Sequence, residues 1–154
     1  MRPSEKIIKT IDSTQLMKWP LQELSQLDQD YFPWPWKPAQ WDTLGDNDTV
    51  YLLIFNSEKN INGFILAQQN DYEKMSHLLK ILVLPDRQNQ GLGFNLMHAY
   101  KSELKKQKFD KIFLEVAVNN QKAVQFYQKL GFQILTRVAG FYPGEDAYRM
   151  ELII

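Results

Sequence analysis

The stretch HLLKILVLPDRQNQGLGFNLMHAYKSELKK, residues 77–106, changes its hydrophobic period half-way along. Residues 77–84 form an apolar run that ends before Pro85, which predicts a buried strand. From Gln90 to Lys106 the period becomes helical, with apolar residues on one face at Leu92, Leu96, Met97, Tyr100 and Leu104. A strand that leads through a turn into an amphipathic helix is a building unit of α/β folds.

The turn between them, PDRQNQGLG at residues 85–93, has the composition of a phosphate-binding loop. Glycines let a backbone approach a ligand closely, and the first amides of the next helix carry about half an elementary charge without internal partners. Leu96 stands where a Rossmann loop has its third glycine, and the Gly-Lys-Ser/Thr of a P-loop is absent. A pyrophosphate site of another kind is therefore predicted. The alternative is a glycine-containing turn that binds nothing.

Downstream, residues 111–132 repeat the strand-to-helix arrangement with the sequence KIFLEVAVNNQKAVQFYQKLGF. An apolar strand over 111–118 carries one charge, Glu115, which is unfavourable in such a place unless it is paired or hydrated. Burial beside apolar groups would raise the pKa of this carboxyl toward neutrality, as suits a general base. The helix over 120–130 has Tyr127 on its apolar stripe, Asn120 as a candidate N-cap and Gly131 as a C-cap.

The rest of the chain supplies further strands and two helices. Strands are predicted at 49–55 and 61–68, joined by a hairpin turn, and at about 132–138 and 146–153. Helices at about 14–30 and 38–45 flank the segment YFPWPWKP, residues 31–38, whose prolines exclude a regular helix. No linker or repeat divides the sequence, so residues 1–154 are predicted to form one domain.

Composition excludes several classes of function. The 18 basic and 18 acidic residues cancel, which gives no electrostatic reason for binding nucleic acid or a membrane surface. The lysines between 101 and 111 are interpreted as the solvated face of a helix. With no cysteine and only two histidines, thiolate sites, cysteine nucleophiles and multi-histidine metal centres are not expected. The polar start of the sequence and the lack of a long apolar run favour a cytoplasmic location.

Three segments resemble the GNAT superfamily of N-acetyltransferases. Gln88-x-x-Gly91-x-Gly93 matches its pyrophosphate pattern, residues 114–132 match its L-E-V…N…A…Y…G-F block, and residues 140–150 resemble its Y-Y-x-x-G-E-D-A tail. The resemblance runs from about His77 to the end of the chain and is strongest to ribosomal-protein N-terminal alanine acetyltransferases and Nα-acetyltransferases. It implies an α/β GNAT fold: a mixed, mostly antiparallel, twisted sheet of six to seven strands with a splayed central pair and about four helices.

The resemblance also implies roles for individual residues. Glu115 matches the base that deprotonates the incoming amine, and Tyr127 the acid that protonates the leaving thiolate. Coenzyme A is expected to contact Tyr127 and the strand and loop residues Ile81, Leu82, Val83, Gln88, Asn89, Gln90, Gly91, Leu92, Gly93, Phe94 and Asn120. Trp34 and Tyr142 are expected to contact the acceptor substrate.

The predicted reaction is direct transfer of an acetyl group from acetyl-CoA to a primary amine, without a metal. A protein or peptide N-terminus is the favoured acceptor, whereas a small-molecule amine, a lysine side chain and a non-catalytic coenzyme A-binding module remain alternatives. Either a monomer or a homodimer is compatible with the sequence. Two departures stand out: Gln88 and Phe94 replace basic residues of many relatives, and the loop at Phe141–Gly144 is shorter than usual.

Overall fold

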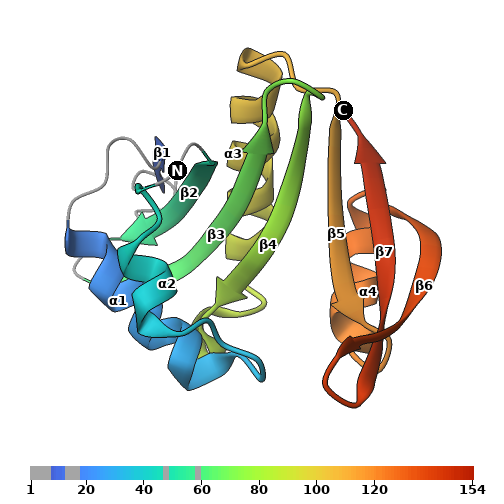
Figure 1. Ribbon diagram of the computed structural model, residues 1–154, viewed down its shortest axis with the longest axis horizontal. Coiled ribbons are helices and arrows are strands. Elements are labelled where there is room, and N and C mark those ends of the chain that lie inside the picture. The colour runs from blue at the N-terminus through green and yellow to red at the C-terminus, as the bar shows by residue number, and fades with distance from the viewer. Residues whose placement is uncertain (1–7, 13–17, 47–48, 58–59) are drawn as a thin grey trace.

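A computed structural model describes residues 8–12, 18–46, 49–57 and 60–154. Its strands form one sheet in the order β1-β2-β3-β4-β5-β7-β6, antiparallel except where β4 meets β5 (Figure 1). The strands are β1 Ile8–Asp12, β2 Val50–Ser57, β3 Ile61–Asn70, β4 Met75–Val83, β5 Lys111–Ala117, β6 Gln133–Tyr142 and β7 Glu145–Ile153.

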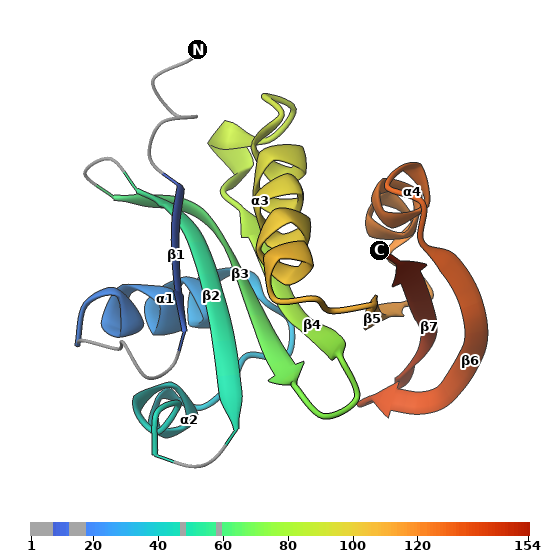
Figure 2. The same ribbon diagram turned by 90° about the horizontal axis from the view of Figure 1, so that it is seen from above.

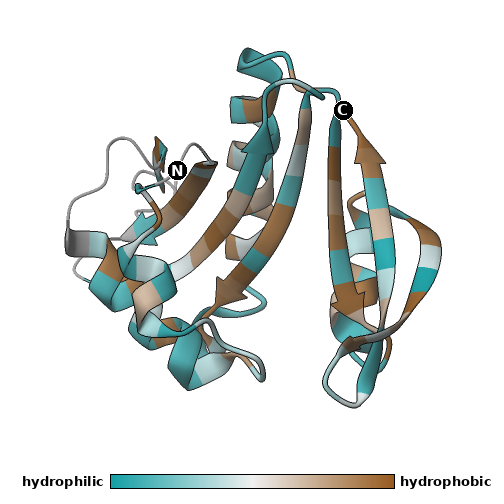
Figure 3. Cartoon of the chain, in the orientation of Figure 1, coloured by the Kyte–Doolittle hydropathy of each residue, from teal (hydrophilic) through white to brown (hydrophobic). Residues whose placement is uncertain are grey.

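Helices cover both faces of the sheet and define two hydrophobic cores. Seen from above, α3 and α4 lie on one face, and α1 and α2 on the other (Figure 2). The hydrophobic residues concentrate in the strands between these layers (Figure 3). The larger core lies under α3 and α4, and a second, centred on Trp41 and Phe64, lies under α1 and α2. The helices are α1 Lys18–Tyr31, α2 Pro38–Asp42, α3 Leu92–Lys106 and α4 Gln121–Lys129.

Strands β4 and β5 are paired over only a short length. The register joins Met75–His77 of β4 to Lys111–Phe113 of β5, and beyond it the two strands diverge (Figure 1). The later part of β4 therefore offers backbone groups on the side where a sheet neighbour would otherwise bind them. This is the splayed central pair that the sequence resemblance predicts.

A bulge in β4 decides which residues face each core. Lys80 pairs with Leu66 and Leu78 with Ala67, so Leu79 has no place in the register. Side chains alternate along a strand, so Leu78 and Lys80 would share a face in a regular strand. The extra residue instead leaves Leu78 in the core under α3 and turns Lys80 toward α1.

Most predicted elements are confirmed, as is the predicted fold class. All the apolar stripe residues predicted for the helix over 90–106 are buried in α3. Gly131, predicted as a C-cap, follows the C-cap Leu130 of α4 and is left-handed with φ 99°. The second predicted helix ends at Asp42 rather than 45, and strand β1 was missed. The predicted helix start at residue 14 and residues 58–59 of the predicted turn lie outside the described residues. Within the described chain, no helix is long and apolar enough to cross a membrane.

Candidate active site

The splay of β4 from β5 opens a cavity of about 360 Å³ between the end of β4 and the starts of α3 and α4. Ile81 and Val83 of β4 form one wall, and Ala123, Phe126 and Tyr127 of α4 form the other. The turn after β4 closes one end. The sequence-predicted residues in this lining are Ile81, Val83, Gln88, Asn89, Gly91, Leu92, Gly93, Phe94, Asn120 and Tyr127.

The turn presents backbone groups to the cavity. Asn89 and Gly91 have φ values of 62° and 79°, in the left-handed region, and no side chain caps α3, which begins at Leu92. The first amides of α3 are therefore presented to the cavity as an anion site. A Cβ at Gly93 would lie 3.3 Å from the Phe126 ring, so this position keeps the loop close to α4.

Gln88 connects the two walls of this cavity. Its Nε2 donates to the carbonyl of Val83 at 3.0 Å, and its Oε1 accepts from Lys122 Nζ at 2.9 Å. Lys122 and Arg87 also line the cavity and place two positive charges beside the turn, where Phe94 is apolar. Sequence reasoning missed Lys122, because its relation to the turn depends on how α4 packs against β4.

A second cavity, of about 490 Å³, meets the first. Ile81, Asn120, Ala123 and Tyr127 line both. Its other walls come from the α1–α2 loop at Phe32–Trp34, from β5 at Glu115, and from Tyr142 at the end of β6. Trp34 stacks on Tyr142 with ring centroids 4.2 Å apart, which joins the two predicted substrate residues from opposite ends of the chain. The two cavities can hold two substrates on either side of one junction.

Tyr127 stands at that junction and is 7% exposed. Burial raises the pKa of its hydroxyl well above the ordinary value, and the neighbouring Tyr142 raises it further. Burial, followed by the charge of Glu115, raises the pKa of Tyr142 as well. Both hydroxyls therefore keep their protons at neutral pH. Tyr127 is thus placed and protonated as a proton donor must be.

Glu115 lines the second cavity, and two basic side chains bind its carboxylate. Its Oε2 lies 2.6 Å from His77 Nε2, and its Oε1 accepts from Arg149 at 2.9 Å. Burial raises the pKa of this carboxyl, but the hydrogen bonds and charges of His77 and Arg149 together outweigh burial and hold the pKa below its usual value. The expectation of a raised pKa was wrong, because neither partner is recognisable from its position in the sequence.

The remaining predicted residues divide between structure and site. Asn120 accepts from the Ala123 amide at 3.2 Å, so it caps α4 and lines both cavities. Leu82 faces the core under α1 and α2, and Gln90 donates to the Asp86 carbonyl; neither lines the first cavity. Among the described residues, no group of three or more histidine, aspartate and glutamate side chains could hold a metal ion.

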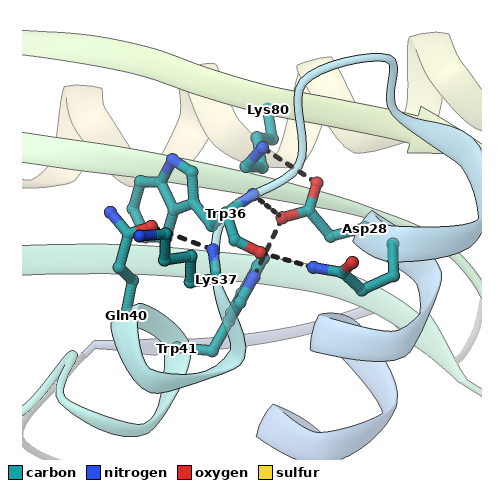
Figure 4. Close-up of polar contacts among 7 residues, drawn as sticks. Asp28, Trp36, Lys37, Gln40, Trp41 and Lys80 are labelled. Atoms are coloured by element: carbon teal, nitrogen blue, oxygen red, sulfur yellow. Dashed lines mark hydrogen bonds and ion pairs between the residues drawn. The ribbon is translucent and has the colours of Figure 1, made fainter.

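The α1–α2 loop is fastened to the sheet through Asp28 of α1 (Figure 4). This fully buried carboxylate accepts from Lys80 Nζ at 2.9 Å, from the Trp36 amide at 2.8 Å and from Trp41 Nε1 at 3.0 Å. Lys80 is itself part of the second cavity's lining. Nothing in the spacing of these residues along the sequence had indicated the cluster.

Comparison with known proteins gives a consistent assignment. The model of the acetyltransferase (GNAT) family matches residues 21–132. The chain belongs to this family. It is 31% identical over 123 residues to the ribosomal protein bS18-alanine N-acetyltransferase of Escherichia coli strain K12, covering 80% of each chain.

An N-alpha-acetyltransferase of Saccharolobus solfataricus is 34% identical over 107 residues, which span 68% of this chain and 63% of that enzyme. The crystal structure of the Escherichia coli S18-alanine enzyme superposes with a TM-score of 0.81, covering 96% of this chain and 94% of that one at 27% identity. The predicted family and fold are confirmed, and with them the prediction of an acetyl-CoA-dependent acyltransferase at the level of the GNAT family.

Proposed function

We propose that this GNAT protein transfers an acetyl group from acetyl-CoA to the α-amine of a peptide or protein N-terminus. The cavity at the turn fits the coenzyme, since it offers helix amides, Arg87 and Lys122 to a pyrophosphate and the unpaired part of β4 to its arm. The second cavity receives the acceptor amine. The similarity to an N-alpha-acetyltransferase and to a ribosomal protein bS18-alanine N-acetyltransferase supports this choice. We also propose that residues 1–154 act as a single domain.

The pairing of the Glu115 carboxylate with His77 and Arg149 is the observation that favours an α-amine. A carboxylate held by His77 and Arg149 is ionised at neutral pH but is a weak base. An α-amine, with an ordinary pKa near 7.8, is roughly a quarter neutral at physiological pH, whereas only about one lysine side chain in a thousand is neutral. A weak base therefore suffices for the first acceptor and not for the second.

The reaction divides between the residues at the junction. The neutral amine attacks the thioester carbonyl, and its surplus proton passes to Glu115, directly or through water. The carbon–sulfur bond breaks as the amide forms, and Tyr127 protonates the departing sulfur. Trp34 and Tyr142 hold the acceptor over the junction, so that the two reactants meet in attack geometry. No covalent enzyme intermediate is required.

Thiol release from acetyl-CoA tests this proposal with a matched panel of acceptors. The panel contains a peptide with a free α-amine, the same peptide with that amine blocked and an internal lysine free, and small primary amines. We expect the free α-amine to react at least about tenfold faster than the lysine at neutral pH. Turnover confined to small amines, or no binding of coenzyme A in calorimetry, would contradict the proposal.

The Tyr127→Phe variant tests the acid in the same assay. We expect its kcat to fall by about tenfold or more while the KM for acetyl-CoA stays close to that of the unchanged protein. The substitution removes only the hydroxyl and leaves the ring packed against Phe126 and Phe132. Full turnover in this variant would remove Tyr127 from the chemistry.

A further inference from the structure

The second cavity, which we call the acceptor cavity, has two charged side chains in its interior, and each of them is paired with a group of opposite charge. Glu115 is held by His77 and Arg149, and Lys80 is held by Asp28. At the rim, Glu145 accepts from both the amide and the side-chain nitrogen of Asn119, at 3.0 and 2.9 Å. The remaining wall around the loop is apolar or aromatic, from Phe32, Pro33, Trp34 and Leu79. Of the charged side chains in this lining, only that of Glu145 has no oppositely charged partner among the described residues, so an acceptor side chain deeper in the cavity meets no unpaired charge.

The Asp28–Lys80 pair is the part of this arrangement that no chemical step uses. Asp28 is fully buried and Lys80 is 7% exposed, and a separation of 2.9 Å joins their charged atoms. Lys80 Nζ also lies 4.7 Å from the ring centre of Phe32 and 5.5 Å from that of Trp36. The ammonium group is therefore surrounded by favourable partners. Removing either charge of the pair would leave the other buried without a counter-ion.

The bulge at Leu79 is what turns Lys80 to this side. The register jumps from Leu78 to Lys80, so the ammonium group meets α1 rather than the core under α3. Asp28 meanwhile holds the Trp36 amide and the Trp41 indole, so the same carboxylate fixes the loop that carries Trp34 (Figure 4). The pair therefore connects the charge of the cavity wall to the position of the acceptor loop.

We propose that the Asp28–Lys80 pair is a specificity determinant: each charge balances the other, so the wall of the acceptor cavity around the α1–α2 loop carries no unpaired charge and the protein selects amines whose neighbouring side chain is uncharged. The inference rests on the proposed function and names the class of acceptor it takes. An acceptor with a charged first side chain would lose hydration without gaining a counter-ion. An acceptor with a small or apolar first side chain contacts Phe32, Leu79 and Trp34 without that penalty.

A series of variants that each remove one or both charges tests the inference directly. The probes are three peptides that differ only in the first residue: alanine, lysine or glutamate. Lys80→Met leaves Asp28 as an unpaired anion, Asp28→Asn leaves Lys80 as an unpaired cation, and the double variant leaves neither charge. For each protein, kcat/KM is measured with all three peptides, while thermal unfolding confirms that the variant is folded.

Opposite shifts in the two single variants are the expected result. In Lys80→Met, kcat/KM for the lysine peptide should rise about tenfold relative to kcat/KM for the alanine peptide. In Asp28→Asn, kcat/KM for the glutamate peptide should rise about tenfold on the same scale. The double variant should again prefer the alanine peptide, even if its absolute rate is lower. If one of the two single variants does not fold, the other one and the double variant still test the inference. The remaining single variant should gain kcat/KM for one charged peptide, and the double variant should not.

Other outcomes separate this inference from the function on which it rests. If the unchanged protein acetylates the alanine peptide but each folded variant slows all three peptides by the same factor, the pair is structural and the inference is overturned. The same holds if the unchanged protein accepts the charged peptides as well as the neutral one. If the unchanged protein acetylates no peptide α-amine, the proposed function itself fails.

Discussion

The two cavities that meet at Tyr127 differ in the parts of the chain that form them. The first cavity, which we propose binds the coenzyme and call the coenzyme cavity, is formed by one continuous piece of chain, β4 through its turn into α3, together with one face of α4. Its anion site consists of backbone amides, left-handed residues and a glycine at a close contact. The acceptor cavity instead joins side chains from the α1–α2 loop, β4, β5 and the β6–β7 turn.

This difference predicts how substitutions in each cavity (the coenzyme half and the acceptor half of the site) change substrate binding and kcat. Backbone amides bind a phosphate whatever the side chains are, so a change that moves the backbone should weaken coenzyme binding most, and loss of the Arg87 or Lys122 charge should weaken it less. Side chains in a cavity act one by one, so the acceptor half should respond to many single substitutions, each with its own effect. Residues at the junction, which touch both halves, should change kcat more than either KM.

Glu115→Gln is expected to have the largest effect. Glutamine fills the same volume but cannot accept a proton, and it leaves Arg149 without its carboxylate partner. We expect kcat to fall by about a hundredfold or more with an N-terminal peptide, with the KM for acetyl-CoA changed little. Steady-state kinetics with both substrates varied gives the two constants. An equal loss in coenzyme binding would place Glu115 in the coenzyme half instead.

Gly93→Val is expected to have the next largest effect, and on the other side of the junction. A Cβ at this position would already lie 3.3 Å from the Phe126 ring, so valine must push the turn away from α4. We expect the dissociation constant for coenzyme A to rise by about tenfold, which calorimetry measures. Gly93→Ala is the matched control and should show a smaller rise. Unchanged binding in both variants would mean that the turn does not hold the coenzyme.

The same contrast explains how much of the molecule the sequence predicts. The coenzyme half is visible because its signals lie close together: a strand, a glycine turn and a helix within residues 77–106. Tyr127 and Asn120 follow from the register of one helix. Strand β1 was missed because Ile8–Asp12 is short, follows a polar segment, and is recognisable as a strand only when paired with β2.

Most contacts around the acceptor cavity could not be predicted from the sequence, for a physical reason. His77 and Arg149 lie 38 and 34 residues from Glu115, and Lys80 lies 52 residues from Asp28. No local period relates such residues, and only the packed sheet brings them together. The direction of the Glu115 pKa shift depends on these distant partners, so reasoning from its apolar neighbours alone gave the wrong sign.

Trp34→Ala should change the acceptor half alone, by a smaller factor. The indole stacks on Tyr142 at 4.2 Å, and a pair of stacked rings contributes roughly 0.5–1.5 kcal/mol beyond the area that it buries. We expect the KM for an N-terminal peptide to rise about threefold to tenfold, with coenzyme binding unchanged. Trp34→Phe should recover most of the loss, since it restores a ring. A change in the KM for acetyl-CoA would show that the two halves are not separate.

The smallest expected effect is in the pH dependence of stability. It tests the pairing of Glu115 with His77 and Arg149. Burial raises the pKa of this carboxyl, but His77 and Arg149 together lower it by more and hold it below its ordinary value of 4.5. Its charged form therefore stabilises the fold fully above about pH 4.5, and this contribution is lost as the pH falls through the folded pKa. Glu115→Gln lacks that contribution at every pH.

Denaturant unfolding of both proteins between neutral and acidic pH measures the difference. The unchanged protein should exceed Glu115→Gln in free energy of unfolding near neutrality, and the gap should narrow below about pH 4.5. A gap that widens on acidification would mean that burial dominates and the carboxyl is a strong base. Glu115 could then deprotonate a lysine side chain as well as an α-amine, and the preference for N-termini would lose its physical basis.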